Sequence, residues 1–586
     1  MTDPALARPD DVAALLDTAR AWARTELNPE HVATLEAEIA EVEAGSATAL
    51  ASLRSRFSGP LAFGTAGLRA EEGPGESRMN RLVVRRTAAG IARYLWDVLG
   101  PEEAAPTVVI GYDARRGSAD FARDSAAVFT AAGAHVVLAP RPLPTPLLAF
   151  WVRHLHADAG IMVTASHNPP SDNGYKVYLG GRMTDEAGRG AQIVAPADAE
   201  IAARIPHGAG VAEIELAADG WEIAGEDLVD AYRDAALSVL DPELAETRSL
   251  RLVYTPLHGV GGEILPTLLA EAGFTAPHTV PEQAEPDPAF PTVSFPNPEE
   301  PGAMDLALAA AREHAADLVI ANDPDADRLA LAARTAEGDY RMLTGDQVGV
   351  LLGAHLLPRL AAMGRSTAAS LVSSPQLGQL AAAAGVDHYI TLTGFKWISR
   401  APELGYGYEE ALGYCVAPDL VRDKDGLTAA LVAAECVAQL VARGQSVFEA
   451  LAALDADSGS MPSTQVSVRV SDLSLIADTM ARLRQDPPRE LAGDAVTEVE
   501  DLAVGTDALP ATDGLVFHTV TGSRVVIRPS GTEPKLKAYL GTTDADSRRA
   551  QDRLAQLRDA VERLVQSPAA PTRQPGDDAA GGPGTA

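Results

Sequence analysis

A polar loop between two strand-like segments, residues 163–178, places the strongest constraint on how this chain folds. The segment reads VTASHNPPSDNGYKVY, and the apolar run 159–163 that leads into it has the pattern of a buried strand. Two consecutive prolines end any regular structure, and the Ser, Asp, Asn and Gly that follow favour tight turns. The chain then returns through YKVY, which alternates like a strand. The sequence therefore predicts a rigid loop at a strand end that carries Ser166 and His167, with Lys176 on the returning strand.

The length of 586 residues is too great for one hydrophobic core, so we expect roughly three to five domains. A hydrophobic content of 46% is typical of a soluble globular protein. No uninterrupted apolar run is long enough to span a bilayer, and the first residues lack the basic and apolar pattern of a signal peptide. Two cysteines, Cys415 and Cys436, provide no disulfide framework, which favours a reducing, cytoplasmic location.

The chain is strongly acidic, with a net charge of −33 from 48 basic and 81 acidic residues. Such a charge opposes binding to nucleic acid and to anionic membrane surfaces, so we expect neither as a partner. A phosphorylated small molecule is also repelled at long range. Any phosphate site in this chain must therefore concentrate its basic side chains locally.

Strand-like and helix-like segments alternate along most of the chain, which predicts a mixed α/β fold. Residues 10–57 have the pattern of two or three amphipathic helices, and residues 80–99 that of a single helix. Further α/β units begin near Glu226 and near residue 343, and the character changes again after Ser458. Sites in open α/β sheets form at the carboxyl ends of strands, which is where Ser166 is expected.

A second polar loop, NDPDADR at residues 322–328, also follows the pattern of a buried strand. Its three carboxylates alternate along an extended segment, so all three can face one point. Hard oxygen ligands suit magnesium, which keeps open positions for water or phosphate. An acidic turn that caps the next element is the alternative. The spacing makes Asp323, Asp325 and Asp327 candidate metal ligands, with Arg328 beside them.

Four other stretches place glycines, hydroxyls or cations in turns, a composition that suits phosphate or sugar. They are FGTAGLR at 63–69, TGFK at 393–396, GYGYEEALGY at 405–414 and RPSGTEPK at 528–535. Taken alone, residues 63–69 favour a surface turn, residues 405–414 a flexible loop, and residues 528–535 are compatible with a simple hairpin loop. The basic turn around Arg115 suits a solvated surface and a functional role about equally. We expect Lys396 at the end of a strand, and Arg528 offers a planar guanidinium that can bind phosphate with two bonds.

Together these stretches resemble the α-D-phosphohexomutases, the family of phosphoglucomutases and phosphomannomutases. TASHNP resembles the phosphoserine loop of that family, DPDADR its metal loop and RPSGT the phosphate clamp of its last domain. The resemblance extends over about residues 61–540 and is closest to the branch of phosphoglucomutases and phosphopentomutases. It implies an α/β, four-domain architecture around a central cleft, with three similar mixed-sheet α/β domains and a smaller C-terminal α+β domain.

The resemblance also implies domain boundaries. We expect a helical extension at 1–60, a phosphoserine domain at 61–222, a metal-binding domain at 223–335, a sugar-binding domain at 336–456 and a phosphate-binding domain at 457–566. The last segment, 567–586, is rich in Pro, Gly, Ala and Asp, which predicts a disordered tail.

Individual residues acquire roles through the same resemblance. Ser166 would carry a phosphoryl group, and a phosphate oxygen on it would complete a metal site with Asp323, Asp325 and Asp327. The other catalytic residues implied are His167, Lys176, Arg69 and Arg328. The substrate-binding residues implied are Thr393, Gly394, Lys396, Glu409, Glu410, Arg528, Ser530, Gly531, Thr532 and Lys535. Ala411 departs from the family, where a serine is common, and this departure leaves the preferred sugar open.

The activity implied is the interconversion of glucose 1-phosphate and glucose 6-phosphate through a phosphoserine enzyme. Mg²⁺ would be the cofactor, and glucose 1,6-bisphosphate the primer and intermediate. Phosphomannomutase and phosphopentomutase activities are alternatives, and a metal-dependent phosphatase or a non-catalytic sugar-phosphate sensor is less favoured. His167 and Lys176 are both candidates for the general base, although a lysine can serve only if its surroundings lower its pKa. We expect a monomer or homodimer that acts on a small phosphosugar.

Overall fold

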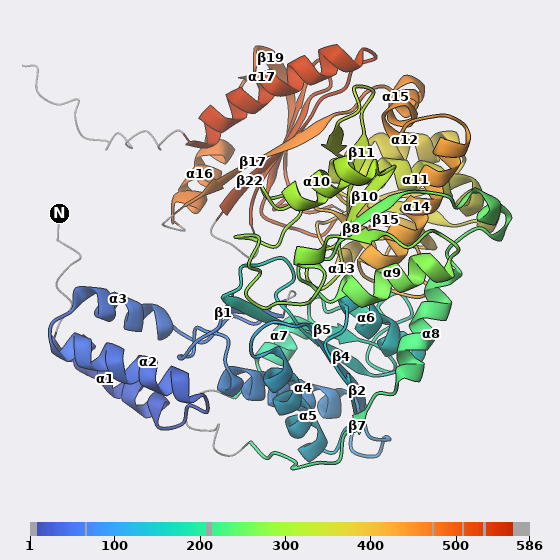
Figure 1. Ribbon diagram of the computed structural model, residues 1–586. Coiled ribbons are helices and arrows are strands. Elements are labelled where there is room, and N and C mark those ends of the chain that lie inside the picture. Colours follow the sequence, from blue (N-terminus) through green and yellow to red (C-terminus); the bar gives the residue numbers. More distant parts are fainter. Residues whose placement is uncertain are drawn as a thin grey trace, which may run out of the picture. The chain divides into compact units, whose positions relative to one another are not determined.

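The computed structural model describes residues 9–64, 67–206, 214–470, 474–506, 509–530 and 535–566 (Figure 1). The chain forms two compact units, Met1–Ser373 with Leu377–Ala453, and Ser374–Gln376 with Leu454–Ala586. No single helix among the described residues is long and apolar enough to cross a membrane, although one bent pair, Gly426–Ala442 with Val447–Ser458, passes by length and composition. The tail predicted to be disordered, 567–586, lies outside the described residues.

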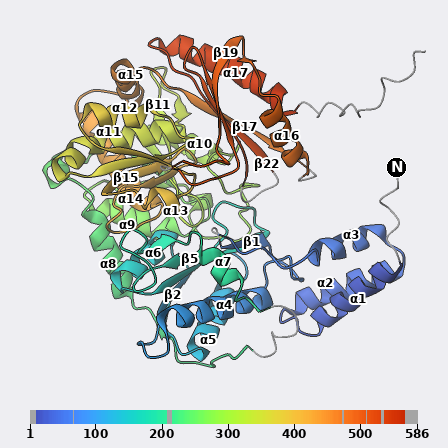
Figure 2. The same ribbon diagram turned by 180° about the vertical axis from the view of Figure 1, so that it is seen from behind.

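The first unit begins with three helices, shown in blue in Figures 1 and 2: α1 (Pro9–Ala23), α2 (Pro29–Glu43) and α3 (Ala47–Arg56). They are the helices expected over residues 10–57. The side chains of Asn28 and Ser46 cap α2 and α3 by accepting hydrogen bonds from backbone N–H groups of the first turn. Arg56 on α3 pairs with Glu38 on α2 at 2.9 Å, which fixes the two helices against each other.

The first sheet has the strand order β1-β5-β4-β2-β3-β7, with β6 paired to β5. Strands β2, β3 and β4 are parallel, whereas β5 is antiparallel to β4. All five residues of β4 are buried, because helices α4 and α5 cover one face of the sheet and α6 the other (Figures 1 and 2). The elements are β1 (Leu68–Glu71), α4 (Arg81–Leu99), β2 (Thr107–Tyr112), α5 (Ser118–Ala131), β3 (His135–Leu138), α6 (Thr145–His154), β4 (Ala159–Val163), β5 (Asp172–Leu179), β6 (Ala191–Gln192), α7 (Ala197–Ala202) and β7 (Glu222–Ile223).

The second sheet has the order β12-β11-β10-β8-β9, in which β9, β8 and β10 are parallel and β11 is antiparallel to β10. The predicted irregular segment at 281–301 contains only the short 3₁₀ helix Pro281–Gln283. The elements are α8 (Glu226–Leu237), a 3₁₀ helix (Pro242–Thr247), β8 (Leu252–Thr255), α9 (Gly261–Glu271), β9 (His278–Thr279), α10 (Asp305–His314), β10 (Leu318–Ala321), β11 (Ala330–Arg334) and β12 (Tyr340–Met342).

The third sheet has the order β14-β13-β15-β16, again with three parallel strands and an antiparallel fourth. Its first helix, α11, starts with a capping box in which Thr344 and Gln347 exchange hydrogen bonds. The elements are α11 (Gly345–Met363), β13 (Ser366–Ser370), α12 (Gln376–Ala383), β14 (His388–Thr391), α13 (Phe395–Ile398), β15 (Leu404–Glu409), β16 (Gly413–Cys415), α14 (Gly426–Ala442) and α15 (Val447–Ser458).

One topology is repeated in these three sheets. If the four central strands of each are numbered in chain order, their spatial order is second, first, third, fourth. The fourth strand is always antiparallel to the third, so a short loop joins the two. These loops contain Ser166, the acidic segment 322–328, and the residues after Glu409, respectively. The expected three similar α/β domains are confirmed, and equivalent loops carry the candidate chemistry.

The second unit contains a single antiparallel sheet of order β17-β22-β21-β20-β19-β18. Phe517, Ile527 and Val561 are fully buried between the sheet and its helices. This is the smaller C-terminal α+β domain that the sequence predicts. Its elements are β17 (Ser463–Arg469), α16 (Ser474–Gln485), β18 (Glu490–Leu491), β19 (Asp494–Asp501), β20 (Leu515–Thr519), β21 (Arg524–Pro529), β22 (Lys535–Gly541) and α17 (Ser547–Gln566).

Two local predictions are wrong. Lys396 does not end a strand: β14 stops at Thr391, and Gly394, with φ of +105°, turns the chain into the short helix α13 that contains Lys396. Residues 405–414 are not a flexible loop either, because they form the antiparallel hairpin of β15 and β16. The tyrosines of this hairpin, Tyr406, Tyr408 and Tyr414, are fully buried.

Candidate active site

Ser166 lies three residues beyond the end of β4, in a loop whose backbone is held from within. The Thr164 hydroxyl accepts a hydrogen bond from the Ser166 N–H at 2.9 Å and donates one to Asp113 Oδ2 at 2.7 Å. Ser166 has a left-handed backbone with φ of +52°, which is uncommon outside glycine. These contacts stabilise that backbone conformation and do not involve the Ser166 hydroxyl.

The guanidinium of Arg115 holds the rest of this loop through hydrogen bonds to its backbone. Its side chain is buried and donates to the carbonyl oxygens of Ser166, Asn168, Pro169 and Asp172, three of them at 2.7 to 3.0 Å. The basic turn after β2, which looked as suitable for a solvated surface as for function, is therefore part of the site. No local sequence signal distinguishes Arg115 from its exposed neighbour Arg116, because its four acceptors lie more than fifty residues further along the chain.

The acidic segment follows β10 and brings three carboxylates together. Oxygens of Asp323, Asp325 and Asp327 lie within 4.8 Å of one another, and all three residues are fully buried. Burial and the two neighbouring carboxylates raise the pKa of Asp323 well above its usual range. Burial opposes ionisation of Asp325 and Asp327 as well, but Lys176 beside both, and Lys424 beside Asp327, outweigh it and lower the pKa values of these two carboxyls. Asp323 is therefore the carboxylate of this cluster that needs a further cation to ionise.

In Asp325 and Asp327 of this cluster, which we call the acidic triad, one carboxylate oxygen is occupied by donors from the described residues and the other is not. Asp325 Oδ2 accepts from Thr145 Oγ1 at 2.6 Å and from Lys176 Nζ at 2.7 Å. Asp327 Oδ2 lies 2.7 Å from Lys176 Nζ and 3.1 Å from Lys424 Nζ. The Oδ1 atoms of Asp325 and Asp327 are buried and have no hydrogen-bond partner among the described residues. Since buried carboxylate oxygens are costly without a partner, the triad fits a divalent cation.

The loop that contains Ser166 lies directly against the acidic triad. Ser166 Oγ donates a hydrogen bond to Asp323 Oδ2 at 2.7 Å, although 157 residues separate the two in sequence. The other oxygen, Asp323 Oδ1, accepts from the Arg328 backbone N–H at 3.0 Å. A phosphorylated Ser166 has no hydroxyl proton to donate, so phosphorylation would release Asp323 Oδ2 toward the same point as the two unpartnered oxygens.

Basic side chains surround this point. Arg328 Nε lies 3.8 Å from Asp327 Oδ1 and 3.9 Å from Asp323 Oδ2. Arg69 stands on β1, next to β5, and donates to Asn168 Oδ1 at 3.3 Å. β1 can approach β5 this closely because Gly67, with φ of +73°, has no Cβ, which would lie 1.8 Å from the Tyr175 carbonyl oxygen.

The two candidate bases differ in their surroundings. His167 Nδ1 lies 3.4 Å from Ser166 Oγ, and burial together with Arg328 and Arg69 holds the pKa of His167 well below its usual range. Burial opposes the charge of Lys176, but its two triad carboxylates outweigh burial and raise the pKa of Lys176. At neutral pH His167 is therefore a neutral imidazole that can accept a proton, and Lys176 is a charged ammonium.

The hairpin of the third sheet is attached to the metal loop. The Arg328 guanidinium donates to the Ala411 carbonyl, Leu329 N–H donates to the Leu412 carbonyl at 3.0 Å, and Arg328 bridges Gly413. At the same turn, Glu410 accepts hydrogen bonds from the hydroxyls of Ser370, the last residue of β13, and Ser373, which follows the strand. Ala411, which has no side-chain hydroxyl, thus contacts Arg328 through its backbone oxygen.

The predicted sugar-binding residues lie in two different places. Thr393, Gly394 and Lys396 belong to the turn and helix before β15, in the first unit, as do Glu409 and Glu410. The clamp residues belong to the second unit, at the connection of β21 and β22, where Ser530 N–H donates to the Lys535 carbonyl at 2.8 Å. Gly531 and Thr532 lie outside the described residues, and Arg528 and Lys535 stand at the facing ends of the two strands.

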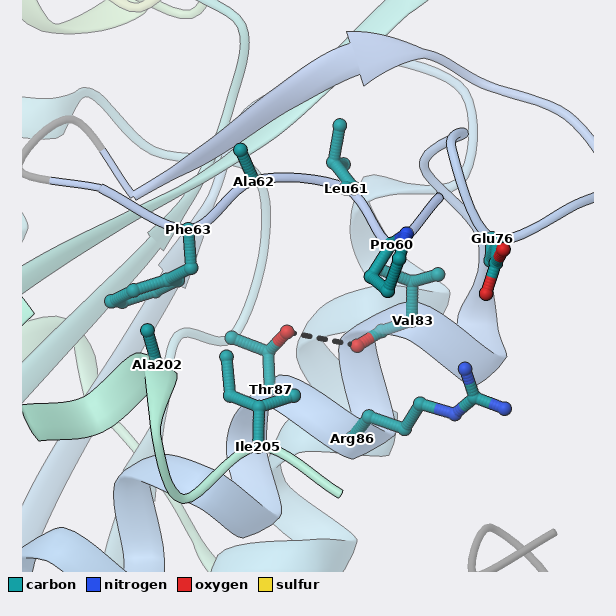
Figure 3. Close-up of a pocket in the computed structure, with 10 residues that line it drawn as sticks. All are labelled: Pro60, Leu61, Ala62, Phe63, Glu76, Val83, Arg86, Thr87, Ala202 and Ile205. Atoms are coloured by element: carbon teal, nitrogen blue, oxygen red, sulfur yellow. Dashed lines mark hydrogen bonds between the residues drawn. The ribbon is translucent and has the colours of Figure 1, made fainter. Parts of the chain in front are cut away.

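The structure thus brings Ser166, His167, Lys176, Arg69, Arg328 and the acidic triad together within the first unit. Lys424, which the sequence analysis did not select, joins them from the start of α14. Its alkyl chain fills the space that a Cβ on Gly413 would need, since that Cβ would lie 2.5 Å from Lys424 Cδ. Its ammonium lies 5.5 Å from the ring centre of Phe395. None of these residues lines the pocket of about 200 Å³ drawn in Figure 3, which lies between residues 60–63, α4 and the end of α7.

Comparison with known proteins identifies the family. Models of the phosphoglucomutase/phosphomannomutase domains match in order: α/β/α domain I at residues 60–207, domain II at 230–338, domain III at 344–456 and the C-terminal domain at 467–561. This chain belongs to the phosphoglucomutase/phosphomannomutase family. The expected family and its four-domain architecture are confirmed, and the chain is an enzyme of the phosphotransferase and isomerase type.

Relatives within the phosphoglucomutase/phosphomannomutase family have different names. A probable phosphomannomutase of Haemophilus influenzae is 44% identical over 492 residues, which cover 84% of this chain and 98% of that protein. The phosphopentomutase of Homo sapiens is 34% identical over 574 residues, with 88% and 89% covered. A phosphoglucomutase of Staphylococcus haemolyticus is 35% identical over 513 residues, with 83% and 90% covered. Similarity to family members therefore leaves the sugar open.

Solved structures of the family share the fold. A putative phosphomannomutase from Thermus thermophilus superimposes with a TM-score of 0.67 at 24% identity, and covers 87% of this chain and 100% of its own. The phosphoglucomutase parafusin from Paramecium, in an open form, gives a TM-score of 0.65 at 18% identity, with 88% and 98% covered. At these identities the likeness concerns the fold alone.

Proposed function

We propose that this enzyme interconverts glucose 1-phosphate and glucose 6-phosphate through a phosphoserine at Ser166 and a bisphosphorylated sugar. The observation that carries the proposal is the 2.7 Å hydrogen bond between Ser166 Oγ and Asp323. A hydroxyl nucleophile buried against a potential divalent-cation site is the arrangement that phosphoryl transfer requires. A hydrolase also needs these two parts, but it needs neither a sugar-reading hairpin nor a second phosphate clamp.

The proposed reaction has two mirrored halves. In the first, the bond between phosphorus and Ser166 Oγ breaks, a bond to the free hydroxyl of the sugar phosphate forms, and the hydroxyl proton passes to a base. The bisphosphorylated sugar then turns end over end. In the second half its other phosphate returns to Ser166, the proton moves back, and the isomeric monophosphate is released.

Residues of the first unit would carry the transfer itself. Asp323, Asp325 and Asp327, with a phosphate oxygen on Ser166, would hold Mg²⁺, which offsets negative charge on the transferring group when it is bound. Arg328 and Arg69 lie where they would neutralise the remaining phosphate oxygens. His167, neutral and 3.4 Å from Ser166 Oγ, fits the role of base, whereas Lys176 would fit only after losing its two carboxylate partners.

Substrate recognition is proposed for two further groups. Thr393, Gly394, Lys396, Glu409 and Glu410 would contact the sugar and its phosphate. The clamp residues would anchor the phosphate that is not being transferred, and they are Arg528, Ser530, Gly531, Thr532 and Lys535. Because the chain has a net charge of −33, a phosphate site must gather basic side chains locally, and the clamp does so with Arg528 and Lys535.

Phosphopentomutase and phosphomannomutase activities are the second candidate functions. Ala411 offers no hydroxyl where the family commonly has a serine, so the hairpin makes one sugar contact fewer. One hydrogen bond to a substrate hydroxyl decides the preference between sugars by about 1 to 3 kcal/mol. Relatives named after pentose and mannose cover most of this chain.

The decisive experiment compares kcat/KM for glucose, mannose and ribose 1-phosphates, with Mg²⁺ and a trace of the matching sugar bisphosphate. We expect the highest value with glucose 1-phosphate, and a clear preference for ribose or mannose overturns the choice of sugar. Release of inorganic phosphate without any 6-phosphate product would instead indicate a phosphatase.

The covalent step has its own test. Radiolabelled glucose 1,6-bisphosphate should label the wild-type enzyme at Ser166, and Ser166→Ala should lose both the label and the exchange reaction. Ser171→Ala is the matched control, because it removes an exposed hydroxyl from the same loop. Full turnover by Ser166→Ala would remove the proposed mechanism.

A further inference from the structure

We propose that Thr145 is a positioning residue of this enzyme, which holds the carboxylate of Asp325 in one orientation so that its Oδ1 atom remains available to a divalent cation. The proposal rests on the metal site of the proposed function. Thr145 is in the first domain and Asp325 in the second, and 180 residues separate them in sequence. The contact therefore aligns the phosphoserine domain with the metal loop.

Thr145 makes two hydrogen bonds to the same residue. Its hydroxyl donates to Asp325 Oδ2 at 2.6 Å, and its backbone N–H donates to the Asp325 carbonyl oxygen at 2.9 Å. This N–H is the first of α6, where helical N–H groups have no partner within the helix. Thr145 is fully buried, so water does not compete for either bond. Side chain and backbone of Asp325 are thus fixed by one residue of the first domain.

The hydroxyl decides which oxygen of Asp325 remains for a cation. Oδ2 accepts two hydrogen bonds, from Thr145 and from Lys176, and this satisfies it. Oδ1 is buried and has no hydrogen-bond partner among the described residues. Rotation of the carboxylate would break both hydrogen bonds to Oδ2, so the two donors hold the carboxylate in one orientation and leave Oδ1 as the oxygen without a partner in the part of the chain that the structure describes.

Loss of the hydroxyl removes this constraint without removing the ligand. In Thr145→Val a methyl group would replace the hydroxyl 2.6 Å from Oδ2, which is closer than carbon and oxygen pack. The carboxylate must turn or shift, and Oδ1 leaves its position. Residues that orient a metal ligand from behind change metal affinity by about 10- to 100-fold. Thr145→Ser keeps the donor and should restore the geometry.

The test is Mg²⁺ affinity of the full-length enzyme, measured by titration calorimetry without substrate. We expect Thr145→Val to raise the Kd for Mg²⁺ by about 10-fold or more, and Thr145→Ser to stay within about threefold of wild type. The rate of Thr145→Val should recover at high Mg²⁺, with the KM for the sugar phosphate unchanged. Thr87→Val is the matched control, since it removes a buried hydroxyl that bonds only within α4 (Figure 3).

Wild-type Mg²⁺ affinity in Thr145→Val overturns the proposal, and so does an equal loss in Thr145→Ser. If Thr145→Val does not fold, Thr145→Ala removes the same donor without the steric clash, and unchanged affinity in that variant also overturns the role. The variant Asp325→Asn tests the metal site itself, so it distinguishes a wrong role for Thr145 from a wrong proposed function. If wild type binds Mg²⁺ no better than Asp325→Asn, the metal site itself is wrong, and the role of Thr145 falls with it.

Discussion

At the scale of single residues, the site balances buried charge before any ligand arrives. Three carboxylates of the acidic triad face three cations, Lys176, Lys424 and Arg328, all within 4 Å. A phosphoserine adds about two negative charges, which a divalent cation offsets. The site can therefore take up phosphate and metal together at little net electrostatic cost, whereas either alone leaves a buried charge uncompensated.

Arg115 gives the first prediction at this scale. Arg115→Lys should reduce kcat by about 10-fold or more, because one ammonium cannot reach four carbonyl oxygens that a planar guanidinium spans. The Asp113 carboxylate, 3.2 Å from Arg115 Nε, also loses part of its buried partner, so thermal unfolding should begin several degrees lower. Steady-state kinetics and a melting curve measure both effects. Arg116→Lys, at the exposed neighbouring position, should change neither.

The sequence predicts some of these residues and misses others for a physical reason. Ser166 and the acidic triad are recognisable because each group of ligands is local and follows an apolar strand. Arg115, Thr145 and Lys424 act on partners that become neighbours only when the domains have folded. In the sequence alone, Arg115 could belong to a surface turn, Thr145 to the start of a helix and Lys424 to a helix cap. No sequence motif therefore selects these residues as part of a site.

At the scale of secondary-structure elements, the hairpin of β15 and β16 shows why residues 405–414 did not look like strands. Glycines alternate with tyrosines there, and glycine is usually a sign of a turn. In the structure these glycines allow close packing, since a Cβ on Gly407 would lie 2.5 Å from Ile398. The tyrosines between them are fully buried, and Tyr406 donates to the Gly349 carbonyl at 2.8 Å. Tertiary packing thus overrides local propensity in this element.

The same hairpin gives a prediction about pH. Burial, with the nearby carboxylates of Glu409 and Asp346, raises the pKa of Glu410 from 4.5 to about 7. The folded hairpin therefore holds a proton that the unfolded chain has lost between these pH values. Its contribution to stability is full below pH 4.5 and is lost as the pH rises through about 7.

Glu410→Gln keeps an acceptor for the two serine hydroxyls but cannot ionise. We expect the fall in the free energy of unfolding between pH 5 and pH 8 to be smaller in this variant by about 1 to 2 kcal/mol. Glu72, whose pKa burial also raises to about 7, contributes equally to both proteins and cancels. Denaturant titrations at several pH values measure the difference, and an equal pH dependence in variant and wild type contradicts it. Glu403→Gln, at an exposed position just before β15, is the control.

At the scale of the whole molecule, the site of the first unit is built from one loop repeated in three domains. The loop between the third and fourth strands contains Ser166, the proposed nucleophile, in the first domain, the acidic triad in the second and the turn after Glu409, proposed to contact the sugar, in the third. In each domain the loop after the first strand contacts this loop: through Arg115 in the first, through Val260 bonded to Pro324 in the second, and through Ser373 bonded to Glu410 in the third. The sequence predicted the four domains, but not that equivalent loops divide the work.

Because the acidic triad joins the first and second domains, metal should stabilise them together. Addition of Mg²⁺ at about 100 times its Kd should contribute about 2.7 kcal/mol and raise the melting midpoint of the wild type by several degrees. Asp325→Asn should show no such rise, and a chelator should return the wild type to the lower midpoint. Differential scanning calorimetry, with NaCl at matched ionic strength as control, measures this. Equal stabilisation of Asp325→Asn would place the ion elsewhere.

The pairing of Arg328 with Gly413, together with the Leu329–Leu412 hydrogen bond, has a consequence for the catalytic cycle. These contacts join the end of the segment 322–328 to the turn at residues 411–413, so we expect the two loops to move together. In the proposed mechanism, both halves of the reaction would then use this joined pair of loops as one frame. We expect the bisphosphate to release its contacts and rotate as a free body between the two transfers, while that frame stays unchanged.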